Sequence, residues 1–451
     1  MRHSVDRPLH LPAHPTRRVI LHGAAWAVPA VALVAATPAF AASGKTLSFS
    51  AASYSGLTCS TITTAVVKAA NGAAAAAGVS IALQLSGGYT FDGGGTSATV
   101  VTGSDGSVSC GTIHVPGTGA TGTLSASSSG ATGATATLTA SDARILTSPS
   151  GVANVTSIPV GSTPVGQDYF LAGGVLYKSG TGAVATGIAA VGRLVESPSG
   201  NATFLLPVRR SDGSAAVFST SAGTLTAVSG TPSGATPLAA DLFLSGSSIY
   251  RGGAAVATDV AEAGQLISHD AGSGSSSTFF LPYRSSVGSA RILRLPNNDV
   301  RTVPEYGTAN GPGSGATPIA DDLFLSSGNI YRVSWDGTSA YGTGIVASGI
   351  AAFGTLTPNP YYSGERLLPV RRTGTGEAAL FMVSGNSVRT ATNVPTGCTP
   401  LGADFFSSNG TIFQDVSGGV ATSVSAYGAA GPAAYGSNKV TVPFTVSSSS
   451  C

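Results

Sequence analysis

The chain has 451 residues, of which only 9% are charged, and its formal net charge is +2. Its 61 glycines, together with abundant serine, threonine and alanine, favour an extracellular all-β protein with short polar turns. A near-neutral charge without a basic stripe excludes nucleic acid as an expected partner, and the regular apolar runs exclude a disordered chain.

Residues 1–41 have the pattern of an export signal. Arg17 and Arg18 resemble the paired arginines of a twin-arginine signal, and an apolar run extends over residues 24–36. Ala39-Phe40-Ala41 has small residues at both ends, which is a cleavage pattern. The apolar run is shorter than the roughly 20 residues that cross a membrane. We therefore expect a secreted or surface-associated protein of actinobacterial type, whose mature chain starts at Ala42 and has no membrane span.

Four cysteines, Cys59, Cys110, Cys398 and Cys451, follow this segment. An even count in an exported protein favours two disulfides, and three connectivities are possible. Pairing between cysteines that are near in the sequence is expected, Cys59 with Cys110 and Cys398 with Cys451. Each bridge would be worth roughly 4 kcal/mol in the chain-entropy model.

Residues 42–142 are expected to form an immunoglobulin-like β-sandwich. The segments VSIALQL (79–85) and ATATLTA (134–140) alternate apolar and polar positions, which predicts half-buried strands. Asn71-Gly72 and Asp105-Gly106 are turn signals between such strands. A unit of about 100 residues with about seven strands has the size of this fold.

The segments VVKAANGAAAAAGVSIALQLSGGYTF (66–91) and TGTLSASSSGATGATATLTA (121–140) also carry a family resemblance. They resemble bacterial Ig-like domains of the invasin and intimin type. The resemblance implies a spacer or adhesive unit at the cell surface. Two features depart from the family pattern: the stretch 54–59, and the cysteines Cys59 and Cys110.

Residues 143–451 contain one template in four copies: GSTPVGQDYFLAGGVLY, GATPLAADLFLSGSSIY, GATPIADDLFLSSGNIY and GCTPLGADFFSSNGTIF. Each copy places an aspartate, a phenylalanine and a second aromatic residue at the same distances from its proline. These residues are Asp168, Phe170 and Tyr177; Asp241, Phe243 and Tyr250; Asp322, Phe324 and Tyr331; and Asp404, Phe406 and Phe413. A glycine follows each copy, at 192, 264, 354 and 428.

A second signature completes each period: FLLPVRR, FFLPYRS, RLLPVRR and VTVPFTV. The last copy lacks the two strand-like segments that follow the other three, and residues 143–146 and 152–158 resemble those missing segments. The two ends are therefore complementary halves of one sheet, as the closure of a β-propeller requires. Each period holds two strand clusters, so we expect eight blades, with seven as the alternative.

The template itself predicts a blade hairpin. Phe243 is expected opposite Tyr250 across a four-residue turn, as an aromatic cross-strand pair. Leu242 and Leu244 point to the other face. Both faces are apolar because a blade packs between two neighbours, and burial of one such phenylalanine is worth roughly 2 to 3 kcal/mol.

Repeated polar residues could carry chemistry. The repeated aspartates could form a ring of ligands or acids, but their presence in every copy favours turns closed onto backbone N–H groups. Arginines recur two residues after the proline of the second signature, as Arg209, Arg284 and Arg371. They could bind an anionic sugar or a phosphate, although a structural partnership with the repeated aspartates or a solvated position is favoured.

Non-repeated residues offer fewer candidates. Trp335, Tyr341, Tyr361 and Tyr362 lie in insertions of the third repeat; they could stack on a sugar, whereas ordinary loop packing is the simpler interpretation. After residue 41 the only histidines are His114 and His269, in different predicted domains. No metal, cofactor or catalytic residue is therefore expected; a Ser-His-Asp site would have to use His269 beside Asp270.

The sequence thus predicts an Ig-like sandwich followed by a β-propeller in residues 143–451. The expected function is a monomeric extracellular binding or adhesion protein for a glycan or a protein ligand. One alternative is a carbohydrate-active propeller enzyme, a glycosidase or a lyase, which would need two facing carboxylates in the glycosidase case. Another is a structural protein of the cell envelope.

Overall fold

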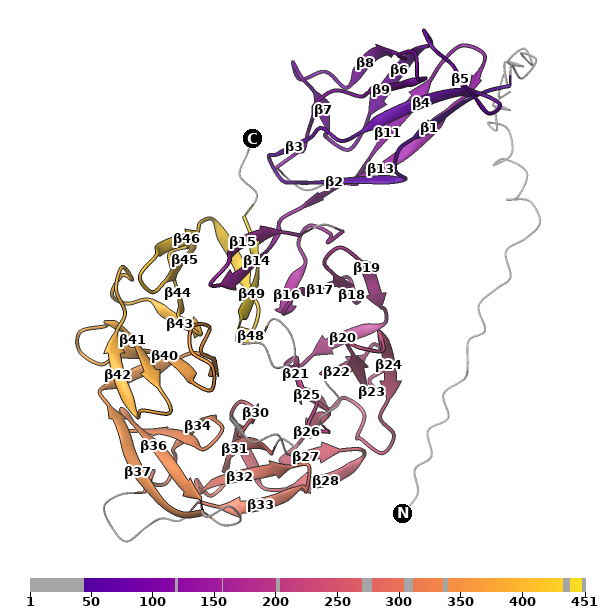
Figure 1. Cartoon of the computed structure of the whole chain (residues 1–451). Coiled ribbons are helices and arrows are strands. Elements are labelled where there is room, and N and C mark those ends of the chain that lie inside the picture. The colour runs from indigo at the N-terminus through magenta and orange to yellow at the C-terminus, as the bar shows by residue number, and fades with distance from the viewer. Residues whose placement is uncertain are drawn as a thin grey trace, which may run out of the picture.

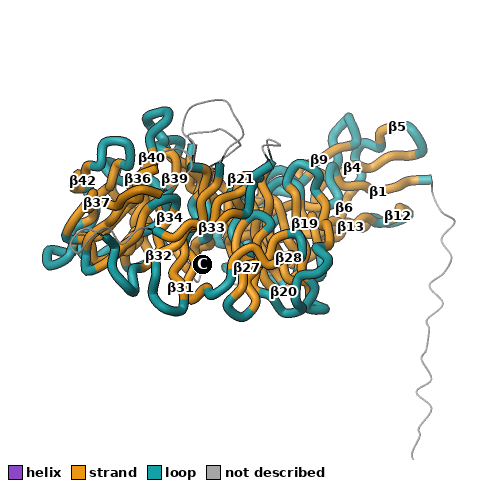
Figure 2. The backbone as a smooth tube through the Cα atoms, turned by 90° about the horizontal axis from the view of Figure 1, so that it is seen from below, coloured by secondary structure: helices purple, strands orange, loops and turns teal. Residues whose placement is uncertain are grey.

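The computed structural model describes residues 44–117, 121–155, 157–199, 203–269, 278–303, 311–335, 340–432 and 439–447. The expected export signal, residues 1–41, and Cys451 lie outside these ranges. Within them the regular elements are the strands β1 to β49, and no helix has the length and apolarity to cross a membrane. The strands build an elongated N-terminal sandwich and a ring of sheets (Figure 1). Seen from its edge, the ring is a flat disc with the sandwich at its rim (Figure 2).

Two five-stranded sheets and a small third sheet make up the N-terminal sandwich. The first sheet contains β12 (Ala131–Thr132), β1 (Lys45–Phe49), β4 (Val66–Asn71), β5 (Ala74–Ala75) and β9 (Ser107–Ser109). The second contains β2 (Ser53–Leu57), β13 (Ala134–Ser141), β11 (Thr121–Ser127), β6 (Ser80–Leu85) and β8 (Ser97–Val101). The third contains β3 (Thr61–Ile62), β10 (Ile113–His114) and β7 (Thr90–Phe91).

One apolar core fills the space between these sheets. In β6 the side chains alternate between exposed and buried, so Ile81, Leu83 and Leu85 face the core while Ser80 and Ala82 face solvent. The same alternation in β11 and β13 places Leu124 and Leu138 in that core. The period-two pattern of the sequence is therefore the pattern of burial.

The expected cysteine pairs are wrong. Cys110 and Cys398 are both free thiols, and both are buried. Cys110 belongs to the sandwich core, and Cys398 packs against Phe406 in the ring. Cys59 is disulfide-bonded, but its bond is with neither of these two. Nearness in the sequence failed as a guide because each expected pair contains one of these thiols, and each thiol is packed among apolar side chains instead.

Within the described ranges after residue 142, eight sheets follow one another. Seven of them are continuous in sequence: β16 to β19 (163–185), β20 to β24 (188–227), β25 to β28 (236–257), β29 to β33 (260–302), β34 to β37 (317–348), β38 to β42 (350–390) and β43 to β46 (399–421). Each period of the sequence thus supplies two sheets. Figure 1 shows them around a common centre, the arrangement of a β-propeller.

The remaining sheet joins the two ends of the ring. It contains β15 (Gly151–Asn154), β14 (Ala143–Ser148), β49 (Val440–Val446) and β47 (Val424–Tyr427), with β48 (Gly431–Pro432) beside β49. β14 and β49 are antiparallel, with Leu146 opposite Val442. The predicted closure by strands from both ends is confirmed. It removes the open edges that a linear stack of sheets would present.

The predicted aromatic pair is also confirmed. Phe243 in β26 (Leu242–Ser245) lies opposite Tyr250 in β27 (Ser248–Arg251), although the turn between the strands is shorter than expected because Ser245 pairs with Ser248. Phe243 packs against the preceding sheet, in a cluster with Ala215, whereas Leu242 packs against the following sheet, in a cluster with Phe279 and Leu281. Each sheet is therefore buried on both faces.

Candidate functional site

Four short strands lead from the ring wall toward its centre. These arm strands are β21 (Val195–Glu196), β30 (Ile267–Ser268), β39 (Thr357–Pro358) and β48, and each pairs with the second strand of its sheet. Figure 1 places β21, β30 and β48 around the middle of the ring, and Figure 2 shows β21 and β39 on one side of the disc. The described loop 359–365, which follows β39, is therefore on the face where a central site would lie.

The repeated glycine before each arm allows two sheets to approach. A Cβ on Gly264 would lie 2.7 Å from Ile319 O and 3.0 Å from Pro282 Cγ, closer than real side chains allow. The next residue, Gln265, donates its backbone N–H to Ile319 O at 2.8 Å. Equivalent contacts follow Gly192, Gly354 and Gly428. The glycine recurs because every junction between repeats needs this close contact.

Side chains from different repeats also meet across the centre. Gln265 donates from Nε2 to Leu356 O at 2.8 Å, and Leu356 N–H donates to Gln265 Oε1 at 3.1 Å. Arg193 Nη2 lies 3.4 Å from Thr355 Oγ1, and burial lowers the pKa of Arg193 to about 10. Equivalent positions of the repeat are occupied by Arg193, Gln265 and Thr355. The contacts at the centre are therefore made by different residue types at the same position of the repeat.

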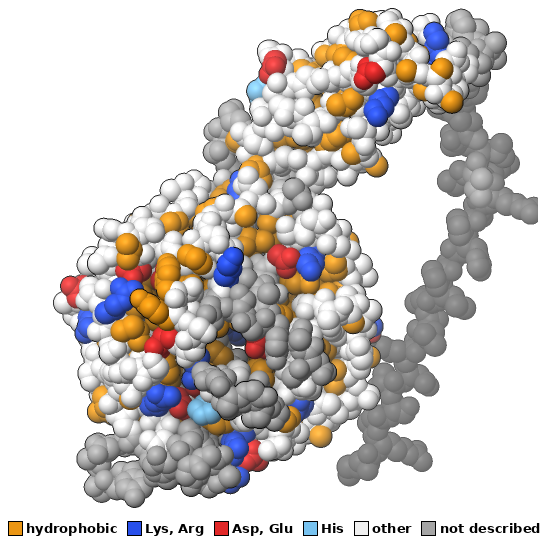
Figure 3. Space-filling model, in the orientation of Figure 1, with side chains coloured by type: hydrophobic (Ala, Val, Ile, Leu, Met, Phe, Trp, Pro, Cys, Tyr) orange, Lys and Arg blue, Asp and Glu red, His pale blue; other side chains and the backbone are white. Residues whose placement is uncertain are grey.

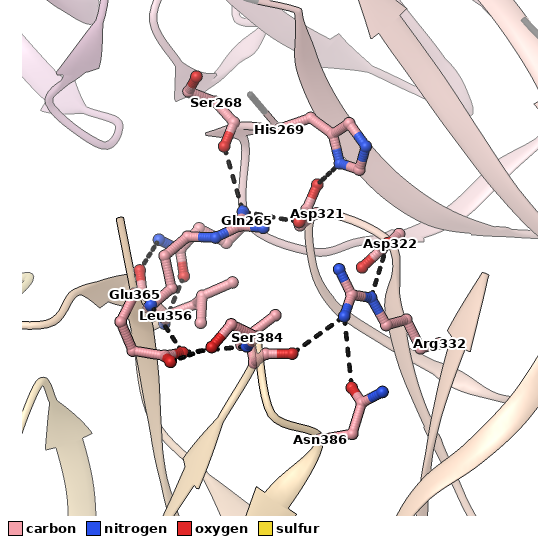
Figure 4. A network of polar contacts seen from close by, with 12 residues as sticks. Gln265, Ser268, His269, Asp321, Asp322, Arg332, Leu356, Glu365, Ser384 and Asn386 are labelled. Carbon is pink, nitrogen blue, oxygen red and sulfur yellow. Dashed lines mark hydrogen bonds and ion pairs between the residues drawn. The ribbon is translucent and has the colours of Figure 1, made fainter. Parts of the chain in front are cut away.

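The most distinctive polar cluster surrounds Asp321, which has no exposed side-chain surface. His269 Nδ1 donates to Asp321 Oδ1 at 2.6 Å, and Arg366 Nη1 lies 2.6 Å from Asp321 Oδ2 (Figure 4). Arg366 also donates to Ser268 O at 3.2 Å. His269 stacks on Phe280 with ring centroids 4.0 Å apart. One carboxylate therefore orients an imidazole and a guanidinium that come from different sheets.

All three members of this cluster depart from the repeat. At the position of Asp321 the other copies have Gln167, Ala240 and Ala403; at the position of Arg366 they have Phe204, Phe279 and Val440; at the position of His269 they have Ser197, Asn359 and Ala433. Ala240 and Phe279 share one apolar cluster, as do Ala403 and Val440. The second and fourth repeats thus fill this place with apolar contacts, and the first has an amide, Gln167, that donates to Pro432 O. Blade packing alone therefore does not require the charged cluster.

A second buried carboxylate lies beside the first. Asp322 Oδ2 accepts from Arg332 Nε at 3.1 Å, while its Oδ1 is buried and has no hydrogen-bond partner among the described residues. Arg332 also donates to Val383 O at 2.9 Å and to Asn386 Oδ1 at 3.3 Å (Figure 4). The two adjacent aspartates are therefore each held by a separate guanidinium.

The two carboxylates differ in protonation. Burial alone would raise the pKa of Asp321, but Arg366 and His269 outweigh it, so its pKa lies below the usual range. Burial and the charge of Asp321 raise the pKa of Asp322 to about 6. Two like charges this close disfavour joint ionisation, and the group with the better partners keeps its charge.

A metal-ligand geometry exists here, but its charge is already balanced. His269, Asp321 and Asp322 each offer a ligand atom within 4.8 Å of the others. Arg366 and Arg332, however, neutralise the two carboxylates that would attract a cation. A divalent ion would bring two further positive charges beside two partly buried guanidinium groups, which is unfavourable. The cluster is better suited to recognition or orientation than to holding a metal.

Three of the four repeated aspartates bind the side chain ten residues later, rather than only closing backbone turns. Asp241 Oδ2 accepts from Arg251 Nε at 2.8 Å, as Asp322 does from Arg332. In the last copy, Asp404 Oδ2 accepts from Gln414 Nε2 at 3.0 Å. Each partner lies on the strand that pairs with the one after the aspartate. Sequence reasoning missed this because it compared the aspartates with each other and not with their cross-strand neighbours.

The three predicted arginines bind groups of the protein itself. Arg209 Nη1 donates to Gly234 O at 3.2 Å, and Arg371 Nη1 donates to Gly397 O and Cys398 O at 3.3 Å each. Arg284 Nη2 lies 2.9 Å from Glu262 Oε2. The three therefore do not pair with the repeated aspartates.

The predicted aromatic residues are separated. Trp335 and Tyr341 belong to the paired strands β36 (Asn329–Trp335) and β37 (Ala340–Ser348), and their side chains lie outside the described part of the chain. Tyr361 and Tyr362 lie in the loop 359–365 after the arm strand β39, with 50% and 71% of their surface exposed. Tyr361 donates its hydroxyl to Asp404 Oδ2 at 2.8 Å, and that contact fixes the loop.

The described side chains on the ring face seen in Figure 3 carry few charges. Figure 3 shows acidic and basic side chains in small groups of mixed sign, separated by polar and apolar surface. Such a face gives little long-range attraction to a strongly charged polymer. Recognition on it would depend on short-range contacts.

No protein-family model and no curated protein sequence matches this chain. Among solved structures, it is similar to an auxiliary nutrient binding protein from Bacteroides thetaiotaomicron, with 10% identity, a TM-score of 0.30, and 88% of this chain and 97% of that chain covered. A protein of unknown function from the same bacterium gives 10% identity, a TM-score of 0.30 and coverages of 88% and 98%. TolB from Acinetobacter baumannii gives 9% identity, a TM-score of 0.31 and 63% coverage of each chain.

Proposed function

We propose that this chain is an exported binding or adhesion protein, and that it contacts an extracellular glycan or protein through the ring face that carries the loop 359–365. The carrying observation is the exposure of Tyr362 in a loop that is fixed at both ends. Tyr361 binds Asp404 near the start of the loop, and Arg366 binds Asp321 directly after its end. An exposed aromatic ring on a fixed loop costs little conformational entropy when a partner binds.

Two further features support the export and adhesion parts of this proposal. Residues 1–41 have the twin-arginine pattern and the cleavage pattern described above. Residues 42–142 resemble the Ig-like modules that act as spacers or adhesive units in the invasin and intimin type. In this proposal the sandwich holds the propeller of residues 143–451 away from the surface to which the protein is attached.

Binding is favoured over hydrolysis because of the state of the carboxylates. A glycosidase needs one carboxylic acid and one carboxylate that face each other across the scissile bond, about 5 to 10 Å apart. Asp321 and Asp322 are instead adjacent, buried and bound by guanidinium groups. Asp404 is bound by Tyr361 and Gln414. These groups are committed to internal contacts.

The test is retention of the purified full chain on arrays of glycans and extracellular matrix proteins. We expect saturable binding to a restricted set of spots, and a decrease in affinity of about tenfold or more for Tyr362→Ala, as for a central aromatic contact. Val287→Ala is the control, because Val287 is also exposed, at 72%, but lies outside the loop. Equal binding by both variants would contradict the role of this face.

The same protein should be incubated with a polysaccharide panel. Release of product that is lost in Asp321→Asn or Asp322→Asn, while the fold is retained, would replace the binding proposal by an enzymatic one. If neither retention nor product release occurs, the interpretation as a structural envelope protein is favoured instead.

A further inference from the structure

The first repeat contains an aspartate and a lysine that do not form the ion pair found at the same positions in the second and third repeats. Asp168 and Lys178 occupy the positions of the Asp241–Arg251 and Asp322–Arg332 ion pairs. Among the described residues, Asp168 and Lys178 form no ion pair with each other or with any other group. The same position in the repeat therefore provides a carboxylate and an ammonium group that are not joined to each other in an ion pair.

The neighbouring residue explains why this pair is open. Tyr169 stands where repeats two and three have Leu242 and Leu323. Lys178 Nζ lies over the Tyr169 ring, 5.5 Å from its centroid, and the cation–π attraction holds it there. Leucine offers a cation no such alternative, which accounts for the closed pairs in the two other repeats.

The open pair lines a cleft of about 520 Å³, within the roughly 300–1,000 Å³ that is typical of small-molecule sites. The cleft lies between the closing sheet and the first two sheets that follow it, with Asn154, Phe204 and Thr441 among its walls. Its other polar groups are mostly hydroxyls, from Thr147, Ser179, Thr220 and Ser221. It is thus distinct from the cluster around Asp321.

The chemistry of the lining defines the ligand class. The charges of Asp168 and Lys178 cancel, so a strongly charged ligand would meet one favourable and one unfavourable group. The hydroxyl groups of a sugar both donate and accept hydrogen bonds. They can therefore bind to a cleft that offers a carboxylate acceptor, an ammonium donor and several protein hydroxyls. We propose that this cleft binds a neutral saccharide unit, with Asp168 accepting hydrogen bonds from its hydroxyls and Lys178 donating to its oxygens.

This site is independent of the function proposed for the face around Tyr362. Its test is saturation-transfer NMR on the full chain with glucose, galactose, mannose, N-acetylglucosamine and the disaccharides maltose and lactose. We expect transfer to at least one of these sugars, and loss of that signal in both Asp168→Asn and Lys178→Met. Because this pair is open, both variants are expected to keep the thermal midpoint of the unaltered protein.

Asp241→Asn is the matched control, since it changes the closed pair of the second repeat and should leave the sugar signal intact. Glucuronic acid and glucosamine test the charge argument, and stronger transfer to either than to every neutral sugar would overturn it. Absence of transfer to all the neutral sugars would overturn the proposal, as would a signal that survives in both cleft variants. Tyr362→Ala should not change the signal, which separates this result from the array experiment.

Discussion

Arg366 Nη1 lies 2.6 Å from Asp321 Oδ2, at a place where the second repeat has Phe279 and Ala240 in contact with the same apolar cluster. An ion pair has replaced an apolar contact in one copy of a repeated scaffold. The side chains at the same positions in the other copies therefore show which substitutions can replace this ion pair, and the effect of the pair on stability can be measured against them.

Removal of one partner of this ion pair should lower the free energy of unfolding strongly, whereas replacement of the whole cluster should not. Arg366→Ala leaves Asp321 buried without its cation, and we expect a loss of about 3–5 kcal/mol in the free energy of unfolding. The triple variant His269→Ser, Asp321→Ala, Arg366→Phe reproduces side chains found at these positions in other repeats. It is expected to be as stable as the unaltered protein or more so.

Urea unfolding followed by circular dichroism measures both variants. A triple variant that is less stable than Arg366→Ala would show that the cluster stabilises the ring in a way that the repeat cannot replace.

Gly264→Ala tests the close approach between repeats. The added Cβ would meet Ile319 O at 2.7 Å, so we expect a loss of about 1–3 kcal/mol, as for an overpacked core. Gly344→Ala is the control, because its Cβ would meet no atom within 4 Å. The thermal midpoints of the two variants should differ clearly. Equal midpoints would contradict the steric reason given for the repeated glycine.

Asp322 should make stability depend on pH in a defined window. Its pKa of about 6 in the folded protein is above its ordinary value of 3.8, so the folded state binds this proton more tightly than the unfolded state. The contribution of Asp322 is therefore favourable below its unfolded pKa and is lost as the pH rises through 6. The pKa of Asp321 is lowered, and its contribution is lost instead when the pH falls below its ordinary range.

Asp322→Asn isolates the first effect, because asparagine does not titrate. The free energy of unfolding of the variant minus that of the unaltered protein should be larger at pH 7 than at pH 4.5. This difference should rise steadily between the two pH values. Calorimetry at a series of pH values measures it. Parallel curves for the two proteins would show that Asp322 has the same pKa in both states.

The free thiols should be unreactive in the native protein. Burial raises the pKa of Cys110 to about 11 and also raises the pKa of Cys398, and only the thiolate attacks alkylating reagents. Iodoacetamide at pH 8 should therefore label neither residue until the chain is unfolded in urea under non-reducing conditions. Mass spectrometry of tryptic peptides identifies the labelled sites. Labelling of native Cys110 would contradict its place in the sandwich core.

The sequence predicts the ring better than it predicts the cluster, for a physical reason. The closure by β14 and β49 and the pair Phe243–Tyr250 follow from the register of the template and from its apolar pattern, which recur in every copy. His269 and Asp321 belong to different repeats, and their contact depends on how one arm meets the next template. The sequence contains one indication of this contact: at the positions of His269, Asp321 and Arg366, the residue differs from those in all the other copies of the repeat.

Other misses have the same origin. The cysteines were paired by nearness in sequence, although burial in separate cores decides which thiols can meet. Lys178 is not among the residues that the sequence predicts for a site, and its place over Tyr169, apart from Asp168, is known only from the structure. In each case the deciding contact joins side chains whose orientation the alternating pattern does not specify.

The seam between β14 and β49 has a consequence for biosynthesis. Its last strand ends at Val446, so a ribosome must translate the chain as far as this strand before the ring can close. Until then β14 presents an unpaired edge, and such edges template association with other nascent chains. Contacts between segments so distant in sequence also form slowly. The strand pair that seals the finished propeller is thus the point at which an incomplete one is most prone to aggregate.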